Sequence, residues 1–187
     1  ATTEIYTLSL HDALPISLGE DTSVMRTTAI PSMLETLARN YSYRNRSARL
    51  YEIATVYAPV EGQDLADEQQ VITLGAYGGE MDFFALKGAV EALLVGKNVK
   101  DISFAAQSDG RTFHPGRCAQ VLAGGAVLGI LGQIHPLAAR NYGVDCGLYA
   151  AQLDFPALLA AQAPEARYEP LPRFPSVTRD IAVVCAE

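Results

Sequence analysis

The sequence contains few cysteines, no long apolar run and no excess of positive charge. Its three cysteines, Cys118, Cys146 and Cys185, show no C-x-x-C spacing, which favours reduced thiols over a disulfide framework or a zinc site. No apolar run approaches the roughly 20 residues that span a bilayer, so we expect no transmembrane helix and no membrane partner. Reduced thiols are typical of a cytoplasmic protein. The net charge of −7 disfavours a broad basic surface for nucleic acid, but a local contact stays open.

Both ends of the chain are unusual. It begins without Met and stops at Glu187, directly after a strand-like run, so we expect a fragment of a longer gene product. Residues 1–16 (ATTEIYTLSLHDALPI) resemble the translated product of a common sequencing-adapter oligonucleotide, and we interpret them as an artefact. The alternative is an ordinary amphipathic segment, whose deletion would cost much stability.

A glycine-rich stretch, residues 113–143, organises the middle of the chain. Gly124 and Gly125 separate two β-compatible runs, which predicts a hairpin because glycine reaches positive φ without steric cost. Gly129 and Gly132 lie inside the second run, where glycine usually marks a bulge or a close approach of other backbone. Pro136 to Gly143 has the pattern of a short helix, with Pro at its start and Gly at its end.

The remaining pattern predicts an α+β fold. Apolar spacing predicts a helix from Ile30 to between Asn40 and Asn45, and another over 82–95 with Asp82 as N-cap and a Lys87–Glu91 pair. Further elements are a helix at 155–163 and strands at 49–57, 71–77, 102–106, 148–154 and 177–185, with a polar loop at 59–69 and a proline-rich linker at 164–176. Since the strands are linked by hairpins or single helices, we expect a mostly antiparallel sheet flanked by helices, on one face.

Two histidines raise the question of a metal site. His114 and His135 each precede a proline, which biases both to extended geometry at strand edges. They could form a metal pair, but no nearby Cys, Asp or Glu completes a ligand set, so a structural role is favoured. A phosphate loop is excluded, because the glycines at 124–132 match neither G-x-G-x-x-G before a helix nor the Walker pattern.

Arg49 and Glu52 form an Arg-x-x-Glu pattern on a predicted strand. An arginine and a glutamate near a sheet surface could grip the phosphate and amine of ATP. Positions i and i+3 on a strand face opposite sides, however, which weakens a joint site and leaves an ordinary surface pair as the alternative. No serine or cysteine nucleophile with a histidine and acid partner stands out.

Six ordered segments over residues 18–187 carry a resemblance to a known family. They are EDTSVMRT (20–27), RLYEIATVY (49–57), DFFALKGAVEALL (82–94), HPGRCA (114–119), GILGQIHP (129–136) and a segment at 168–184 that ends in FPSVTRDIAVV. In this order they closely resemble the bacterial phenylalanyl-tRNA synthetase β subunit. The resemblance implies a class II synthetase-like module without catalytic residues at 17–163, and the truncated start of a ferredoxin-like anticodon-binding domain at 177–187.

The same resemblance implies a role in protein biosynthesis as part of a ligase. In the family the paired α subunit activates phenylalanine in an (αβ)2 heterotetramer that uses ATP and Mg²⁺ to charge tRNA(Phe), so we expect no cofactor in this fragment. Class II synthetases use an arginine after a glycine-rich strand, and here none follows Gly125 before Arg140. This module is therefore expected to be a non-catalytic scaffold for the α subunit and tRNA.

The resemblance also assigns residues. The structural motif comprises His114, Gly116, Arg117, Gly129, Gly132 and His135. Arg173 and Arg179 flank the last predicted strand and are candidates for contact with tRNA phosphates, although solvated strand-end charge is the favoured interpretation. Two rival hypotheses stay open: an active nucleotide-binding ligase with Arg49, Glu52 and His114 around a pocket, and a homo-oligomeric binding module that uses an exposed apolar face.

Overall fold

The computed structural model describes residues 24–63, 65–107, 112–164 and 179–184. The helices in these ranges are α1 (Ile30–Ser42), α2 (Phe83–Gly96), α3 (Pro136–Asn141) and α4 (Phe155–Ala160). The strands are β1 (Ser47–Ala58), β2 (Asp67–Gly78), β3 (Ile102–Ala106), β4 (Phe113–Ala123), β5 (Ala126–Ile134) and β6 (Leu148–Asp154). None of these helices is long and apolar enough to cross a membrane.

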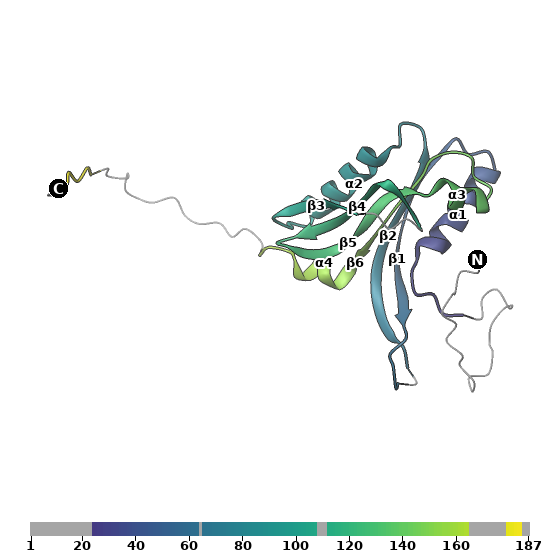
Figure 1. Ribbon diagram of the computed structural model, residues 1–187, viewed down its shortest axis with the longest axis horizontal. Helices are drawn as coiled ribbons and strands as arrows, with labels where there is room; N and C mark the ends of the chain where they lie inside the picture. The colour runs from purple at the N-terminus through teal and green to yellow at the C-terminus, as the bar shows by residue number, and fades with distance from the viewer. Residues whose placement is uncertain (1–23, 64, 108–111, 165–178, 185–187) are drawn as a thin grey trace.

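The six strands form one sheet in the order β1-β2-β6-β5-β4-β3, and each neighbouring pair is antiparallel (Figure 1). This confirms the expected α+β class. The β1–β2 pairing runs from Ser47 opposite Gly78 to Ala58 opposite Asp67. Both strands are therefore longer than predicted, and the polar loop is shorter, because backbone pairing continues through exposed polar residues that carry no strand signal.

Helices cover both faces of the sheet, so the prediction of helices on one face was wrong. α2 and α4 pack on one face together with Tyr149, Ala151 and Leu153 of β6. α1 and α3 pack on the other face, against the alternate residues Leu148 and Ala150. Because successive side chains of a strand point to opposite faces, this central strand is buried on both sides.

The two long helices have the predicted inner faces. In α1, Ile30, Met33, Leu34 and Leu37 are buried. In α2, Leu86, Val90 and Leu94 are buried, and the Asp82 carboxylate caps the helix by accepting a hydrogen bond from the Ala85 N–H at 2.7 Å. The predicted Lys87–Glu91 ion pair forms at 2.5 Å. These local features are confirmed because each depends only on helical spacing.

The glycine-rich stretch folds as predicted. Gly124 and Gly125 connect β4 to β5 with φ of 55° and 84°, the left-handed region that a tight hairpin turn requires. A Cβ at Gly129 would collide with the Gln152 carbonyl of β6, and one at Gly132 would lie 2.7 Å from the Arg117 carbonyl of β4. Both glycines therefore allow close backbone approach, as expected.

The end of the chain differs from the prediction. Residues 179–184 are exposed and form no strand. A strand needs a hydrogen-bonded neighbour, and no strand within the described ranges pairs with these six residues. α4 ends at Ala160, before the predicted end at 163. The interpretation of residues 1–16, and of 165–176 within the predicted linker, lies outside the described residues.

Candidate functional site

A row of polar side chains crosses the sheet beneath the start of α1. Glu52 of β1 is the register partner of Thr73 of β2, which is in turn the partner of Gln152 of β6. Directly paired residues point to the same face, and this is the face that α1 covers. Such a row of polar side chains across three neighbouring strands is a candidate functional site.

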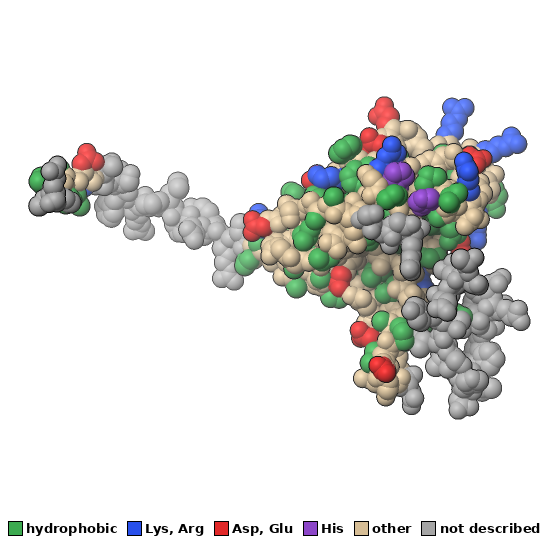
Figure 2. Space-filling model, in the orientation of Figure 1, with side chains coloured by type: hydrophobic (Ala, Val, Ile, Leu, Met, Phe, Trp, Pro, Cys, Tyr) green, Lys and Arg blue, Asp and Glu red, His purple; other side chains and the backbone are tan. Residues whose placement is uncertain are grey.

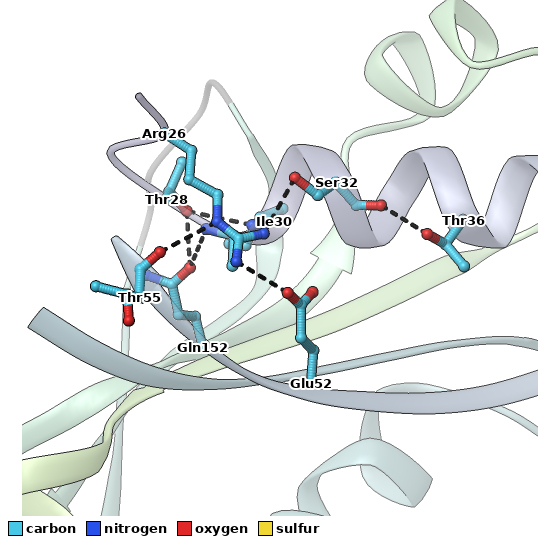
Figure 3. A network of polar contacts seen from close by, with 9 residues as sticks. Arg26, Thr28, Ile30, Ser32, Thr36, Glu52, Thr55 and Gln152 are labelled. Atoms are coloured by element: carbon cyan, nitrogen blue, oxygen red, sulfur yellow. Dashed lines mark hydrogen bonds and ion pairs between the residues drawn. The ribbon is translucent and has the colours of Figure 1, made fainter. Parts of the chain in front are cut away.

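Arg26 connects the segment before α1 to the edge strand β1 (Figure 3). Its guanidinium donates to the Glu52 carboxylate at 2.9 Å and to the Thr55 carbonyl at 3.2 Å, and lies 3.5 Å from the Ser32 hydroxyl. The Arg26 carbonyl accepts from the Tyr57 N–H at 2.9 Å. Both partners of the ion pair are about one-third exposed, so screening limits its contribution to roughly 0–1 kcal/mol. The Arg26 guanidinium is thus engaged by groups of the same chain.

Gln152 supplies the cap that α1 lacks in its own sequence. The N-cap residue, Ala29, makes no side-chain cap, and its N–H donates to Gln152 Oε1 at 3.0 Å. The Thr28 hydroxyl also donates to Gln152 Oε1, at 2.7 Å, and accepts from the Ile30 N–H at 3.3 Å. Since the first N–H groups of a helix have no intrahelical partner, a residue more than 120 positions away completes the helix start.

Thr73 lies between these two anchors and is fully buried. Its hydroxyl has no hydrogen-bond partner within the described residues. The segment 26–30 covers this row, and the hydrogen bonds of Arg26, Thr28 and Gln152 join it to β1 and β6 of the same chain. The network therefore fixes α1 on the sheet.

The residues of the rival active-site hypothesis do not come together. Arg49 lines a small apolar cavity of about 180 Å³ with Leu86 of α2, whereas Glu52 bonds Arg26 on the α1 side. The two residues thus lie on opposite faces of β1, as strand geometry predicts. His114 lies on β4, which three strands separate from β1.

His114 and His135 do lie together. Their rings stack with centroids 6.4 Å apart and an interplanar angle of 25°, and both are visible on the surface in Figure 2. Each Nδ1 accepts a backbone N–H two residues on, from Gly116 at 3.1 Å and from Leu137 at 3.2 Å. Within the described residues no group of three or more His, Cys, Asp or Glu could hold a metal ion. The geometry supports a structural role in two His-Pro turns.

Arg117 reaches from β4 to β5. Its guanidinium donates to the carboxamide oxygen of Gln133, a largely buried residue, at 2.6 Å. This bond ties the motif residue to the strand that carries Gly129 and Gly132. Of the predicted tRNA contacts, Arg173 lies outside the described residues and Arg179 is exposed; their role stays a prediction.

Burial raises the pKa of two neighbouring side chains near α3, Tyr77 and Cys146. Tyr77 is fully buried and its hydroxyl donates to the Asn45 carbonyl at 2.9 Å. Burial raises the pKa of Tyr77, and the nearby Cys146 and Tyr41 raise it further. Burial also raises the pKa of Cys146. This thiol therefore stays protonated at neutral pH, which makes it a poor nucleophile.

The outer side of α2 is the second feature of interest, because it is apolar. Phe84 is 74% exposed and Val95 is 66% exposed, and Gly88 and Ala92 lie between them on the same side of the helix. On β1, Tyr51 and Ile53 are 74% and 52% exposed.

Comparison with known proteins decides the family. The family model "Phenylalanyl tRNA synthetase beta chain CLM domain" matches residues 13–155, which include the whole sheet. The chain belongs to this family. The match begins inside residues 1–16, whose interpretation as adapter-derived stays a prediction.

Relatives of this beta chain family are similar over nearly the whole sequence. The phenylalanine–tRNA ligase beta subunit of Clostridium acetobutylicum is 47% identical over 171 residues, which cover 91% of this chain and 22% of that protein. The subunit of Bacillus subtilis is 34% identical and covers 94% of this chain and 23% of that protein. The chain thus spans about a fifth of the length of these relatives.

Solved structures show the fold. Two structures of pyrrolysyl-tRNA synthetase from Desulfitobacterium hafniense superpose with a TM-score of 0.60 at 14% and 16% identity. Each similarity covers 73% of this chain and 49% of the synthetase. The beta chain module therefore has the class II synthetase-like fold that the resemblance implied.

The sequence did not predict the roles of Arg26 and Gln152 in the network at the start of α1. The signal for Arg26 was its place in the segment 20–27; Gln152 had none.

Proposed function

We propose that this chain is a non-catalytic module of a cytoplasmic phenylalanine–tRNA ligase, which attaches phenylalanine to tRNA(Phe) with ATP. In this proposal the module is a scaffold for the α subunit of an (αβ)2 heterotetramer and for tRNA, which Arg173 and Arg179 contact. Family membership and the beta subunit names of the relatives support it.

ATP and Mg²⁺ do not fit the described residues. Arg49 and Glu52 lie on opposite faces of β1, and Arg26 is paired with Glu52. No cluster of acidic groups suited to Mg²⁺ occurs within the described ranges. We therefore propose that nucleotide chemistry takes place outside this module.

In this proposal the scaffold contacts its partner through the exposed apolar line of α2. This line is formed by Phe84, Gly88, Ala92 and Val95. An exposed apolar surface of this kind marks an interaction site. Because the relatives are beta subunits, the occupant we propose is the α subunit. Phe84 would serve as an anchor, as large aromatic residues do in protein interfaces.

The test is co-purification of a full-length β subunit that contains this module with its α subunit. With the double variant Phe84→Asp/Val95→Asp, the amount of α subunit that co-purifies should fall to a small fraction of the unmodified value. The matched control, Leu65→Asp/Leu137→Asp, adds the same charge at two other exposed apolar positions and should retain it. Failure of the unmodified full-length subunit to form the complex would overturn the proposed function, and equal behaviour of both variants would overturn the α2 interface.

The rival ligase hypothesis has its own measurement. ATP–pyrophosphate exchange by the 187-residue chain with phenylalanine should stay at background, because the required residues are not assembled. Exchange well above background that is lost in Arg49→Ala would support the rival instead.

A further inference from the structure

The turn from α1 into β1 carries four arginines in a chain of net charge −7. Arg39 lies in the last turn of α1, and Arg44 and Arg46 lie in the connection. Arg49 follows on β1, with its side chain on the α2 face of the sheet. No Asp or Glu occurs between Glu35 and Glu52. All four arginines are exposed.

Contacts within the described residues do not neutralise these four positive charges. The ion pairs within the described residues are Arg26–Glu52 and Lys87–Glu91, so none of the four arginines has a carboxylate partner there. Arg39 can interact with the helix dipole, but that effect falls off within the last turn. Arg46 and Arg49 lie beyond it, and an uncompensated cluster of cations repels itself.

The turn that presents them is held firmly. The Tyr43 N–H donates to the Arg39 carbonyl at 3.2 Å, and the Asn45 side chain donates to that of Asn40 at 3.0 Å. The buried Tyr77 hydroxyl donates to the Asn45 carbonyl. Arg44 has a φ of 61°, where Gly or Asn is the usual residue. The guanidinium groups thus extend from a fixed backbone.

An aromatic ring stands among the arginines. Tyr43 is 75% exposed, although its neighbour Tyr41 packs against Tyr77. Figure 2 shows Lys and Arg side chains projecting at the end of the molecule where Figure 1 places α1 and α3. Proteins that bind single-stranded nucleic acid without sequence preference usually combine arginines with exposed aromatic side chains.

We propose that the basic turn, defined as Arg39, Tyr43, Arg44 and Arg46, is an RNA-binding surface. The arginine forks contact backbone phosphates, and Tyr43 stacks on an unpaired base. RNA is favoured over an acidic peptide because a peptide has no base to cover the exposed ring. That the RNA is tRNA rests on the proposed function; the surface itself rests on the geometry of the turn.

The experiment measures fluorescence anisotropy of a labelled 20-nucleotide single-stranded RNA with the 187-residue chain at several salt concentrations. Neutralising about three phosphates predicts a slope of log K against log salt of about −2.1, at about 0.7 per contact. Arg44→Gln/Arg46→Gln should reduce the slope by about 1.4. The matched control, Lys97→Gln/Lys100→Gln, removes the same charge from exposed positions beyond α2 and should leave the slope unchanged.

Tyr43→Ala should weaken RNA binding about five-fold or more without changing the slope, since stacking is not electrostatic. Equal slopes for the two double variants overturn the proposal. So does a Tyr43→Ala variant that binds RNA normally while polyglutamate competes as well as RNA does, because the surface would then bind acidic protein. Urea unfolding checks that each variant is folded.

The same variants separate this inference from the proposed function. Arg44→Gln/Arg46→Gln in the full-length subunit should still co-purify with the α subunit. Loss of the salt-slope difference with intact co-purification overturns the basic turn alone. A normal slope difference with no α subunit bound overturns the proposed function alone.

Discussion

Helices α1 and α2 pack on opposite faces of one sheet, and their outer sides differ. α1 exposes Glu35, Thr36 and Arg39, the polar side expected of a helix that faces water. α2 exposes Phe84 and Val95 on either side of Gly88. The inner sides are equally apolar, so the difference reflects what each helix meets outside the module. We infer that water covers the outer side of α1 up to Arg39 of the basic turn, and that a partner covers α2.

The largest effects should come from the inner sides, where the two helices are alike. Leu37→Ala in α1 and Leu94→Ala in α2 each remove a side chain with no exposed surface. Each should cost about 2–5 kcal/mol in the free energy of unfolding, because a cavity stays behind. Urea unfolding of the 187-residue chain measures this. Leu65→Ala, at an exposed loop position, should change stability by less than about 0.5 kcal/mol.

A loss at Leu94 much smaller than at Leu37 would break the comparison. It would mean that the inner side of α2 does not hold the helix firmly on the sheet when no partner is bound.

The next effect should affect α1 alone. Gln152→Ala removes the acceptor of the Ala29 N–H and the Thr28 hydroxyl, and should cost about 1–3 kcal/mol because donors are left unsatisfied. Hydrogen exchange should quicken in the first turn of α1 and stay unchanged in α2. Gln120→Ala, on the same sheet face but without such bonds, is the control. Faster exchange in both helices would show general loosening instead of a lost cap.

A pH effect should follow on the α1 side. The unfolded chain ionises the Cys146 thiol near pH 8.5, while burial raises the pKa of Cys146 in the folded chain. Above that pH the unfolded state binds fewer protons, so stability should fall with rising pH, by at most about 1.4 kcal/mol per unit. Below it, the thiol contributes no pH dependence.

Urea unfolding of the chain and of Cys146→Ala between pH 7 and 9.5 tests this slope. The range stays below about pH 10, where the raised pKa values of Tyr77 and Tyr142 act in the same direction. Parallel curves for the two proteins would contradict the expected effect.

The smallest effect concerns the Lys87–Glu91 ion pair of α2. Glu91→Gln should cost only about 0.2–0.5 kcal/mol, and the difference should shrink in 1 M salt as screening increases. Thermal unfolding at low and high salt measures it. A salt-independent loss would show that Glu91 acts through packing, and would sharpen the interpretation of the α2 outer line.

Local features were predictable because local physics produces them. The Gly124-Gly125 turn, the Asp82 cap and the inner residues of α1 each depend on neighbours within a few positions. The burial of β6 on both faces also had a local signal, since Leu148 to Ala151 is continuously apolar. The prediction of helices on one face overlooked that signal.

The network at the start of α1 had no comparable signal. A glutamine in a strand is usually a solvated side chain, and only the order β1-β2-β6 brings Gln152 beneath Ala29. Likewise, α2 reads as a strongly apolar helix, but the sequence does not show that Phe84 and Val95 point away from the sheet.

The sequence by itself determined the elements, the turns between them and the resemblance to a beta chain of phenylalanyl-tRNA synthetase. These depend on spacing along the chain and on ordered motifs. Only the tertiary structure decided which faces are covered, that Arg49 and Glu52 are apart, and that Arg26 is neutralised within the chain. The reason is that these contacts join residues distant in sequence, and strand order and register alone determine which of them meet.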